Sequence, residues 1–458
     1  MFQHQTVEAL AGVATLIEET ASAPPDIATG TLPATPIVRW LQERGGPIER
    51  FNQTMLLQVP AGMRAADLTA ALQVLLVHHD ALRLRLRLTA AGEEWHLEVA
   101  PVGAVAAADC LQRIDISALA DEGLRASIVK QSQAAESRLA PEAGVMLQAV
   151  WFDTGAKRSG RLLVTIHHLS VDGVSWRILV PDLAAAWAAI SDGREASLPA
   201  RGTSFRDWAQ RLSLHAQQME VAEELSFWRR MLCQPAPAFY QGVLDPARDV
   251  SGTAGHLTLT LPSELTGTLL TRVAAAFHGG INDVLLTGLV LAVVDWRRRR
   301  GRHSVAGIDV EAEASHAVLL DLEGHGREEI FVDVDLSRTV GWFTSQFPVR
   351  LDAGALDLEE ALAGGPALGA ALKRIKEQLR ALPANGLGYG LLRYLNAQTG
   401  AQLASEAVPQ LGFNYLGRMA SEAGDWSAAA EAIWLGGGAS AMPLAHGLEI
   451  NALTLDHP

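Results

Sequence analysis

The stretch RLLVTIHHLSVDGVSWRILVPDLAAAWAAI, residues 161–190, joins a strand pattern to a helix pattern through a short polar junction. Residues 162–166 are apolar and β-branched, which predicts a buried strand, whereas the residues from 180 onward are rich in alanine and leucine at a helical period. The junction contains His167, His168, Asp172 and Gly173. We expect the rest of the chain to be organised around this junction, because functional side chains are often mounted on the turns between elements.

The residue types of the junction favour proton transfer. Histidine gains and loses a proton near neutral pH, and Asp172 could hold an imidazole ring or the loop in place. Gly173 predicts either a positive φ angle or a close approach that a β-carbon would block. The alternative is that one histidine caps the strand and Asp172 caps the following helix.

Two other chemistries are disfavoured at the junction. The chain has no HExxH sequence and only two cysteines, Cys110 and Cys233, so the usual ligand patterns of a metal site are missing. Ser175 does not lie in a G-x-S-x-G sequence, which argues against a serine hydrolase.

Length and composition restrict the class of protein. A chain of 458 residues is too long for one ordinary core, so we expect two lobes of roughly 200 residues each. Runs of strand and helix patterns alternate, which predicts an α/β or α+β fold. The net charge of −14 disfavours nucleic acid and an anionic membrane as partners, and two cysteines are consistent with a reducing, cytoplasmic location.

Three segments bear on targeting and on charge. The first twenty residues lack a basic region and an unbroken apolar region, so we predict no secretion signal. The apolar run 284–294 is too short for a membrane span and predicts a core helix. The four arginines at 297–300 follow that helix, where we expect them to be a solvated cap rather than a nucleic-acid patch.

Local patterns predict elements along the chain. A short helix at 6–19 precedes a linker rich in alanine, proline, threonine and glycine, and this N-terminal segment is too short to fold alone. We expect His78 and His79, at the end of an apolar helix, to pack and cap. The predicted helices are 37–43, 65–79, 221–232 and 263–277, and the predicted strands are 54–59, 84–88, 256–261 and 448–455.

Four further motifs follow in the second half of the chain: EGHGRE at 323–328, TVGWFT at 339–344, PANGLGYG at 383–390 and FNYLG at 413–417. Each alone could be turn chemistry and packing. The third is glycine-rich but lacks the Lys-Ser/Thr of a phosphate-binding loop.

Taken together and in this order with HHxxxDG, these motifs resemble the epimerization domains of nonribosomal peptide synthetases, members of the condensation-domain superfamily. The resemblance runs from about residue 31 to the C-terminus, and residues 2–11 resemble the last helix of a peptidyl carrier domain. It implies an α/β fold of two chloramphenicol-acetyltransferase-like lobes in a V-shaped pseudo-dimer, with a tunnel for a phosphopantetheine arm. The implied organisation is a carrier remnant at 1–20, a linker at 21–32, and lobes at 33–215 and 216–458, the second stopping short of a further strand and helix.

The resemblance also implies roles for individual residues. His168 and Glu323 match the proton-transfer pair of the family. Asp172 matches an aspartate regarded as structural, and Asn414 and Tyr415 match positions near the reacting thioester. The full set of supporting site residues that the resemblance implies is His167, Asp172, Gly173, Ser175, Trp176, Asn414 and Tyr415. The chain departs from the family at Val38 and Leu41, where glutamine and phenylalanine are typical.

The implied function is L-to-D epimerization at Cα of an aminoacyl or peptidyl thioester by deprotonation and reprotonation. Such a reaction needs a base on one face, a proton donor on the other and donors that stabilise an enolate oxygen. We expect no cofactor of its own and no metal, because the scheme requires neither. The substrate is expected to arrive on the 4'-phosphopantetheine of a carrier domain. The expected partners are an upstream carrier and adenylation domain and a downstream condensation domain. A peptide-bond-forming condensation domain using the same His168, or a catalytically silent carrier-docking module, are the alternatives.

Overall fold

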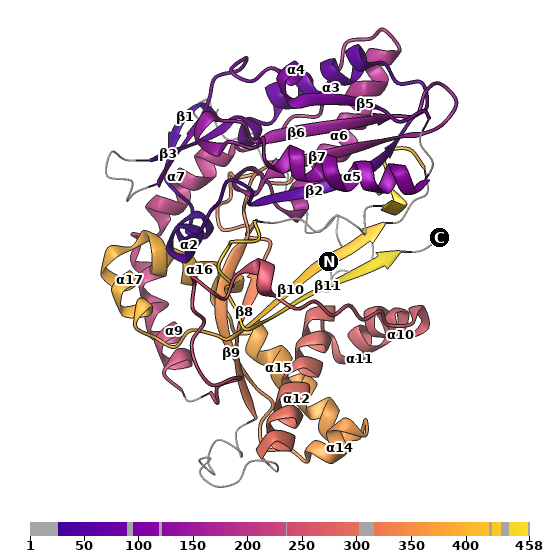
Figure 1. The fold of residues 1–458 in the computed structure, drawn as a ribbon. Helices are drawn as coiled ribbons and strands as arrows, with labels where there is room; N and C mark the ends of the chain where they lie inside the picture. Colours follow the sequence, from indigo (N-terminus) through magenta and orange to yellow (C-terminus); the bar gives the residue numbers. More distant parts are fainter. Residues whose placement is uncertain are drawn as a thin grey trace, which may run out of the picture.

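The computed structural model describes residues 26–88, 95–118, 121–234, 236–301, 316–420, 424–431 and 439–456 (Figure 1). The expected carrier remnant at 1–20 lies outside the described residues. The fold is mixed α/β, as predicted, and its strands form three sheets.

Two of the sheets are built from the first half of the chain. The larger has the order β2-β7-β6-β5, in which only β5 and β6 are parallel, and the smaller has the order β1-β4-β3 and is antiparallel. The strands are β1 (Gly30–Leu32), β2 (Asn52–Val59), β3 (Leu84–Leu88), β4 (Trp95–Val99), β5 (Leu111–Asp115), β6 (Leu147–Asp153) and β7 (Gly160–His167). The helices are α2 (Pro36–Arg44), α3 (Ala65–His78), α4 (Ala107–Cys110), α5 (Asp121–Glu136), α6 (Gly173–Ser191), α7 (Phe205–His215), α8 (Met219–Glu223) and α9 (Leu225–Leu232), with 3₁₀ turns at Asp80–Arg83, Pro141–Ala143 and His168–Ser170 (η3).

The strand of the opening stretch, β7, is buried on both faces, which explains its unbroken apolar sequence. Leu162, Val164 and Ile166 point into the core that includes α3 and α6. Leu163 points the other way, into a second cluster with Ile128 of α5 and with Ala429. Successive side chains of a strand face opposite sides, so both sides of this sheet are covered.

The third sheet is built from the second half, in the order β11-β10-β8-β9, and β10 runs parallel to both of its neighbours. The strands are β8 (Ala317–Gly324), β9 (Ser345–Asp352), β10 (Leu411–Ala420) and β11 (Leu448–Asp456). The helices are α10 (Ser263–Thr268), α11 (Ala274–Phe277), α12 (Ile281–Gly301), α14 (Leu358–Leu362), α15 (Pro366–Arg380), α16 (Leu387–Gly390) and α17 (Ala397–Ala404), with π turns at Leu269–Val273 and Leu391–Leu395 and 3₁₀ turns at Ser251–Thr253 and Pro383–Gly386.

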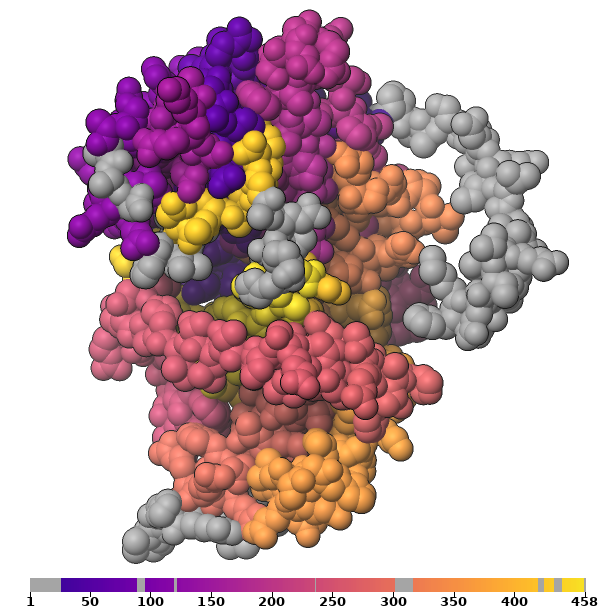
Figure 2. Space-filling model, turned by 90° about the vertical axis from the view of Figure 1, so that its right-hand side faces the viewer, coloured from indigo at the N-terminus to yellow at the C-terminus, as the bar shows by residue number. Residues whose placement is uncertain are grey.

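A segment of the second half returns to the first half, and we call residues 424–431 the crossover segment. It lies beside β2, where the Trp426 N–H donates to the Gln58 carbonyl at 2.7 Å and the Ala429 N–H donates to the Leu56 carbonyl at 2.9 Å. Arg161 of β7 also pairs with Glu431 at 2.9 Å. Figure 2 shows yellow C-terminal residues against the indigo and purple first half.

The exact boundary between two lobes at 215/216 stays a prediction.

Most predicted elements are present, and two predictions are wrong. Residues 256–261 form no strand with any described part of the chain, and Leu257 and Leu259 are 84% and 82% exposed. An alternating pattern becomes a strand only where a neighbouring strand takes up its hydrogen bonds. The prediction of a solvated cap is also wrong for Arg297, which is only partly exposed. It donates to the carbonyl oxygens of Ala317 and Pro237, and burial lowers its pKa to about 10.

The remaining arginines behave as predicted, because Arg298 and Arg299 make surface ion pairs with Glu359 and Asp295. The helix predicted at 221–232 is interrupted at Glu224, between α8 and α9. Among the described helices, none is by itself long and apolar enough to cross a membrane, and one pair, bent by 98° at its break, passes on length and composition only.

Candidate active site

His167 holds the junction in place. Its Nδ1 atom accepts a hydrogen bond from the Leu169 N–H at 3.2 Å, so the ring proton lies on Nε2, which donates to the Ile48 carbonyl at 2.8 Å. Burial lowers the pKa of His167 to about 4. A neutral ring with both nitrogens in hydrogen bonds is a structural group. It fixes the direction in which the next residue points.

His168 is partly buried in η3 and is held by aromatic rings from both halves of the chain. Its ring stacks on Phe51 at 4.9 Å between centroids and packs against Trp342 of the TVGWFT motif at 4.6 Å. Burial lowers the pKa of His168, so the ring is neutral at pH 7. Trp342 thereby ties the proposed base to a motif 174 residues further along the chain.

Gln53 of β2 selects the tautomer of His168. The Trp176 indole N–H donates to the Gln53 side-chain oxygen at 2.8 Å, which turns the Gln53 amide nitrogen toward His168 Nε2 at 3.1 Å. An amide NH₂ can only donate, so Nε2 accepts and the ring proton lies on Nδ1. The lone pair of Nε2 is therefore directed toward the Gln53 amide. A substrate group that replaced this amide as the donor could give its proton to Nε2.

Asp172 links three motifs. Its carboxylate caps α6 by accepting from the Ser175 N–H at 2.8 Å, and Ser175 completes a capping box. Arg327 of EGHGRE binds the same carboxylate through two hydrogen bonds, at 2.6 and 3.1 Å. The Phe343 N–H of TVGWFT donates to it at 3.1 Å. Asp172 is thus a structural group, with all its bonds directed into the protein.

The two motif glycines next to these contacts differ. Gly173 has no positive φ angle, and a β-carbon there would meet nothing within 4 Å, so the prediction for this glycine is wrong. The reason is that it is the first residue of α6, with an ordinary helical backbone. Gly326 does need to be glycine, since its φ is +68° and a β-carbon would lie 1.7 Å from the Phe343 carbonyl oxygen.

Glu323 lies near the C-terminal end of β8. Asn414 of β10 donates a hydrogen bond from its side-chain nitrogen to Glu323 Oε2 at 2.6 Å. More than a third of the Glu323 surface is accessible, yet protein surrounds it closely enough that burial, together with the Glu449 and Asp321 charges, raises its pKa to about 7. A carboxyl group with this pKa is populated in both protonation states at neutral pH, which suits a general acid and base.

Tyr415 is directed away from Glu323. Neighbouring residues of a strand face opposite sides of the sheet, and the Tyr415 hydroxyl makes a 2.9 Å hydrogen bond with the Thr454 hydroxyl of β11. The structure therefore brings Asn414, but not Tyr415, to the Glu323 carboxyl.

The segment that follows Trp342 connects the two proposed proton-transfer groups. Trp342 packs on His168, and Gln346 pairs with Glu323 across β8 and β9. Trp342 and Gln346 are four residues apart, and four residues of fully extended chain span at most about 14 Å, which limits the distance between these two contacts. His168, in the turn after β7, and Glu323, in β8, thus belong to different halves of the chain but to one continuous set of contacts.

The family of the chain follows from comparison with known proteins. The condensation domain model matches residues 32–433. The chain belongs to the condensation domain family. The relatives include a linear gramicidin synthase of Brevibacillus parabrevis, 38% identical over 427 residues and 91% of this chain, and surfactin synthase subunit 1 of Bacillus subtilis (strain 168), 34% identical over 420 residues and 91% of this chain. The chain spans only 8% and 11% of these two proteins.

Solved structures confirm the condensation-domain fold. The epimerization domain from the third module of tyrocidine synthetase B superimposes with a TM-score of 0.78 at 30% identity, covering 95% of this chain and 91% of that one. The first condensation domain of the CDA synthetase has a TM-score of 0.56 at 18% identity, covering 84% and 82%, and shows the fold alone. The predicted α/β, chloramphenicol-acetyltransferase-like class is confirmed.

Several residues of this condensation-family site were not predicted from the sequence. They are Gln53, Arg44, Asp321, His446 and Glu449, all of which contact or electrostatically influence His168 or Glu323. Asp321 had a usable signal, because it lies two residues before Glu323 and so on the same face of its strand. The others come from distant segments, and no local pattern marks them.

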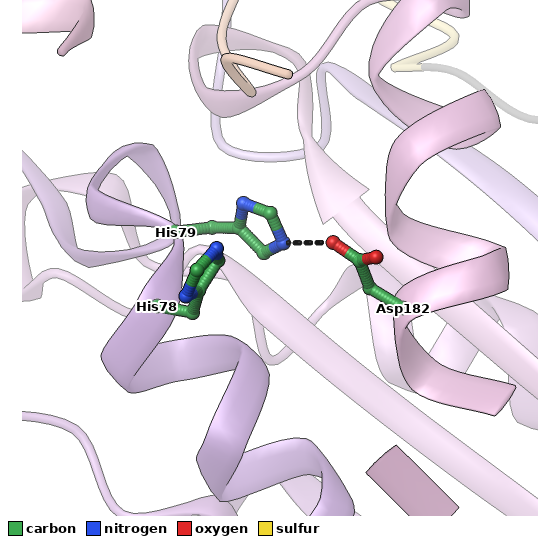
Figure 3. Close-up of side chains that lie close together, drawn as sticks. All are labelled: His78, His79 and Asp182. Atoms are coloured by element: carbon green, nitrogen blue, oxygen red, sulfur yellow. Dashed lines mark hydrogen bonds and ion pairs between the residues drawn. The ribbon is translucent and has the colours of Figure 1, made fainter. Parts of the chain in front are cut away.

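His78 and His79 form a separate cluster with Asp182 of α6 (Figure 3). His79 caps the C-terminal end of α3, and its Nε2 lies 3.0 Å from Asp182 Oδ2. The three possible ligand atoms lie within 4.8 Å of one another, the only such group in the part of the chain that the structure describes. Arg338, however, pairs with the same Asp182 at 2.6 Å and supplies the positive charge there. The prediction that this histidine pair packs and caps is confirmed for His79.

Proposed function

We propose that this domain epimerizes Cα of an aminoacyl or peptidyl thioester, from L to D, while the substrate is carried on the phosphopantetheine arm of a peptidyl carrier domain. The observation that carries the proposal is the Glu323 carboxyl, whose pKa of about 7 and hydrogen bond from Asn414 suit reversible proton transfer. The 30% identity to an epimerization domain over 95% of the chain supports it.

In this reaction the Cα–H bond breaks and its electron pair moves into the thioester carbonyl, giving an enolate. One group accepts the proton on one face, and the other group donates a proton to Cα on the opposite face. His168, neutral with Nε2 as the unprotonated ring nitrogen that accepts from Gln53, and Glu323, available as acid or base, are the proposed pair. Asn414 holds the Glu323 carboxyl through its amide. The domain would need no cofactor of its own for these steps.

The proposal extends to partners and location. We propose a nonribosomal peptide synthetase that makes a secondary metabolite such as an antibiotic, with an upstream adenylation and carrier domain and a downstream condensation domain. The names of the gramicidin, surfactin and tyrocidine synthase relatives support this. We further propose a cytoplasmic location without nucleic acid or membrane partners, which the net charge of −14 supports.

The test is to load a carrier domain with an L-aminoacyl thioester, incubate it with this protein in deuterated water, and measure the mass and chirality of the released residue. We expect both configurations from either starting isomer, with deuterium at Cα, and no turnover on a carrier that lacks its arm.

Two outcomes would contradict epimerization. Unchanged L-residue together with a new peptide bond, when an acceptor carrier is added, would assign a condensation reaction, which the family match also permits. Carrier binding without exchange or bond formation would assign a silent docking module.

A further inference from the structure

We infer that His446 is a positioning residue for Glu323: its ring lies between Asp321 and Glu449 and sets the pH range in which the Glu323 carboxyl transfers protons. The inference rests on the proposed function, and it assigns a role to a residue outside every motif that the sequence singled out. It starts from the face of the second-half sheet that carries Glu323.

Two rows of side chains cross this face. The strand register aligns Asp321 of β8, Gly412 of β10 and Glu449 of β11 in one row. Two residues further along each strand, the next row on the same face contains Glu323, Asn414 and Asn451. Glu323 therefore has a carboxylate two residues before it on its own strand and another two strands away.

His446 fills the gap that glycine leaves in the first row. Its Nε2 donates to Asp321 Oδ2 at 2.9 Å, and its Nδ1 lies 3.9 Å from Glu449 Oε2. A β-carbon on Gly412 would lie 2.5 Å from the His446 Nδ1 atom, so only glycine at this position leaves space for the ring. The residue is 8% exposed, and an imidazole held against two carboxylates in this way is not an ordinary packing residue.

The charges around Glu323 need this cation. The titratable groups that face it are Glu449 of β11, Asp321 of β8, His446 and Arg44 of α2. Arg44 donates to the Pro443 carbonyl at 2.7 Å and is the one permanently charged cation of the group. Arg44 alone would leave one of the Asp321 and Glu449 charges uncompensated, and a charged His446 balances these two carboxylates, apart from Glu323 itself.

The protonation state of His446 agrees with this arrangement. Burial alone would lower the pKa of His446, but the hydrogen bond to Asp321 and the Glu449 carboxylate outweigh burial and raise it to about 9. The His446 side chain in turn lowers the pKa of Glu449. At pH 7 the imidazolium therefore opposes the burial and the like charges that raise the pKa of Glu323.

The experiment compares His446→Gln and Glu449→Gln, with His256→Gln, an exposed histidine of the same half, as the control. The primary readout is the titration of the Glu323 carboxyl by ¹³C NMR of labelled glutamate, assigned with Glu323→Gln, which needs no turnover. The second readout is the pH dependence of α-proton exchange in deuterated water. The substrate for it is the enantiomer that no longer exchanges its α-proton in the Glu323→Gln variant.

We expect opposite shifts in the two variants. His446→Gln removes a nearby positive charge. The midpoint of the Glu323 titration, and the pH at which the exchange rate rises on the acid side of its profile, should therefore both move up by about one pH unit. Glu449→Gln removes a negative charge, so both should move down by a similar amount. Glutamine at 446 can still donate to Asp321, and His256→Gln should leave both measurements unchanged.

The inference is overturned if the Glu323 midpoint stays within about 0.2 pH units of wild type in both variants, even when rates fall, because that is the result of a packing role. If His446→Gln does not fold, as judged by circular dichroism, Glu449→Gln decides alone, and a midpoint that fails to move down overturns it. A failure of epimerization with shifted NMR midpoints would overturn the proposed function instead.

Discussion

At the scale of single residues, burial acts on His168 and Glu323 in the same sense. It disfavours the charged form of each, lowering the pKa of the imidazole and raising that of the carboxyl to about 7. A neutral base and a protonated acid can therefore coexist at neutral pH. This combination is the one that inversion at a carbon requires, with one group taking a proton while the other gives one.

If the two groups work from opposite faces of Cα, removing one should leave an enzyme that exchanges the α-proton of only one enantiomer. His168→Ala and Glu323→Gln should each lower net inversion by about 10²-fold or more. In deuterated water, the variant that keeps the base facing a given enantiomer should still exchange its α-proton with retention, and the pattern should reverse for the other enantiomer. Mass spectrometry with chiral separation measures this. The same exchange pattern in both variants would mean that one base serves both faces.

Gln53 offers a second residue-scale prediction. Gln53→Leu removes the amide that aligns the His168 ring, so we expect kcat to fall by about tenfold with little change in melting temperature. The matched control is Gln112→Leu, on an exposed position of β5, which should have no effect on kcat. A Gln53 variant with wild-type kcat would show that the stacking on Phe51 and Trp342 suffices to orient the ring.

At the scale of elements, the loop after β8 is fastened to the start of α6 by the Arg327–Asp172 pair, whose side chains are 9% and 5% exposed. Local pattern predicted the motif of each residue but not their pairing, since 155 residues separate them. Arg327→Met would leave the buried carboxylate unpaired.

We expect Arg327→Met to lower the free energy of unfolding by about 3–5 kcal/mol, because breaking one side of a buried pair leaves an uncompensated charge. The double variant Arg327→Met/Asp172→Asn should recover part of this loss. Urea denaturation of the two single variants and the double variant gives the coupling. Additive losses would show that the pair has no direct interaction.

The elements also show what could be read from the sequence. Helix and strand periods located β3, α2 and β11, and the motif residues Glu323 and Asn414 meet at one hydrogen bond. The pattern at 256–261 failed because alternation predicts a strand only where a partner strand exists. Gln53 and His446 could not be predicted, since their roles depend on strand register and on the space that Gly412 leaves.

At the scale of the whole molecule, two buried histidines predict how stability depends on pH. His167 has a folded pKa of about 4, below its unfolded value of 6.5, so the stability it contributes is present above pH 6.5 and is lost as the pH falls toward 4. His446 has a folded pKa of about 9, above 6.5, so its contribution is present below pH 6.5 and is lost as the pH rises through 9.

Each of these contributions is on the order of 3 kcal/mol. The raised pKa of Glu323 acts against the His167 contribution between pH 4.5 and pH 7, so we expect a broad maximum of stability at about pH 5–7 and a decline above pH 7. Melting temperatures measured from pH 5 to pH 10 check this. In His446→Gln the decline between pH 7 and pH 9 should become shallower, while the acid side should be unchanged. An equally steep alkaline decline in that variant would contradict the assignment.

The crossover segment has a consequence for the order in which the chain is made. During synthesis β2 leaves the ribosome about 370 residues before Ala429, which supplies its outer hydrogen bonds. At roughly 5–20 residues per second, that edge waits about 20–75 s for its partner. Until then β2 is an open edge in a nascent polypeptide, a site for mispairing with other chains. Slower translation would prolong this exposure, so the yield of folded protein should depend on elongation rate and on the supply of chaperones.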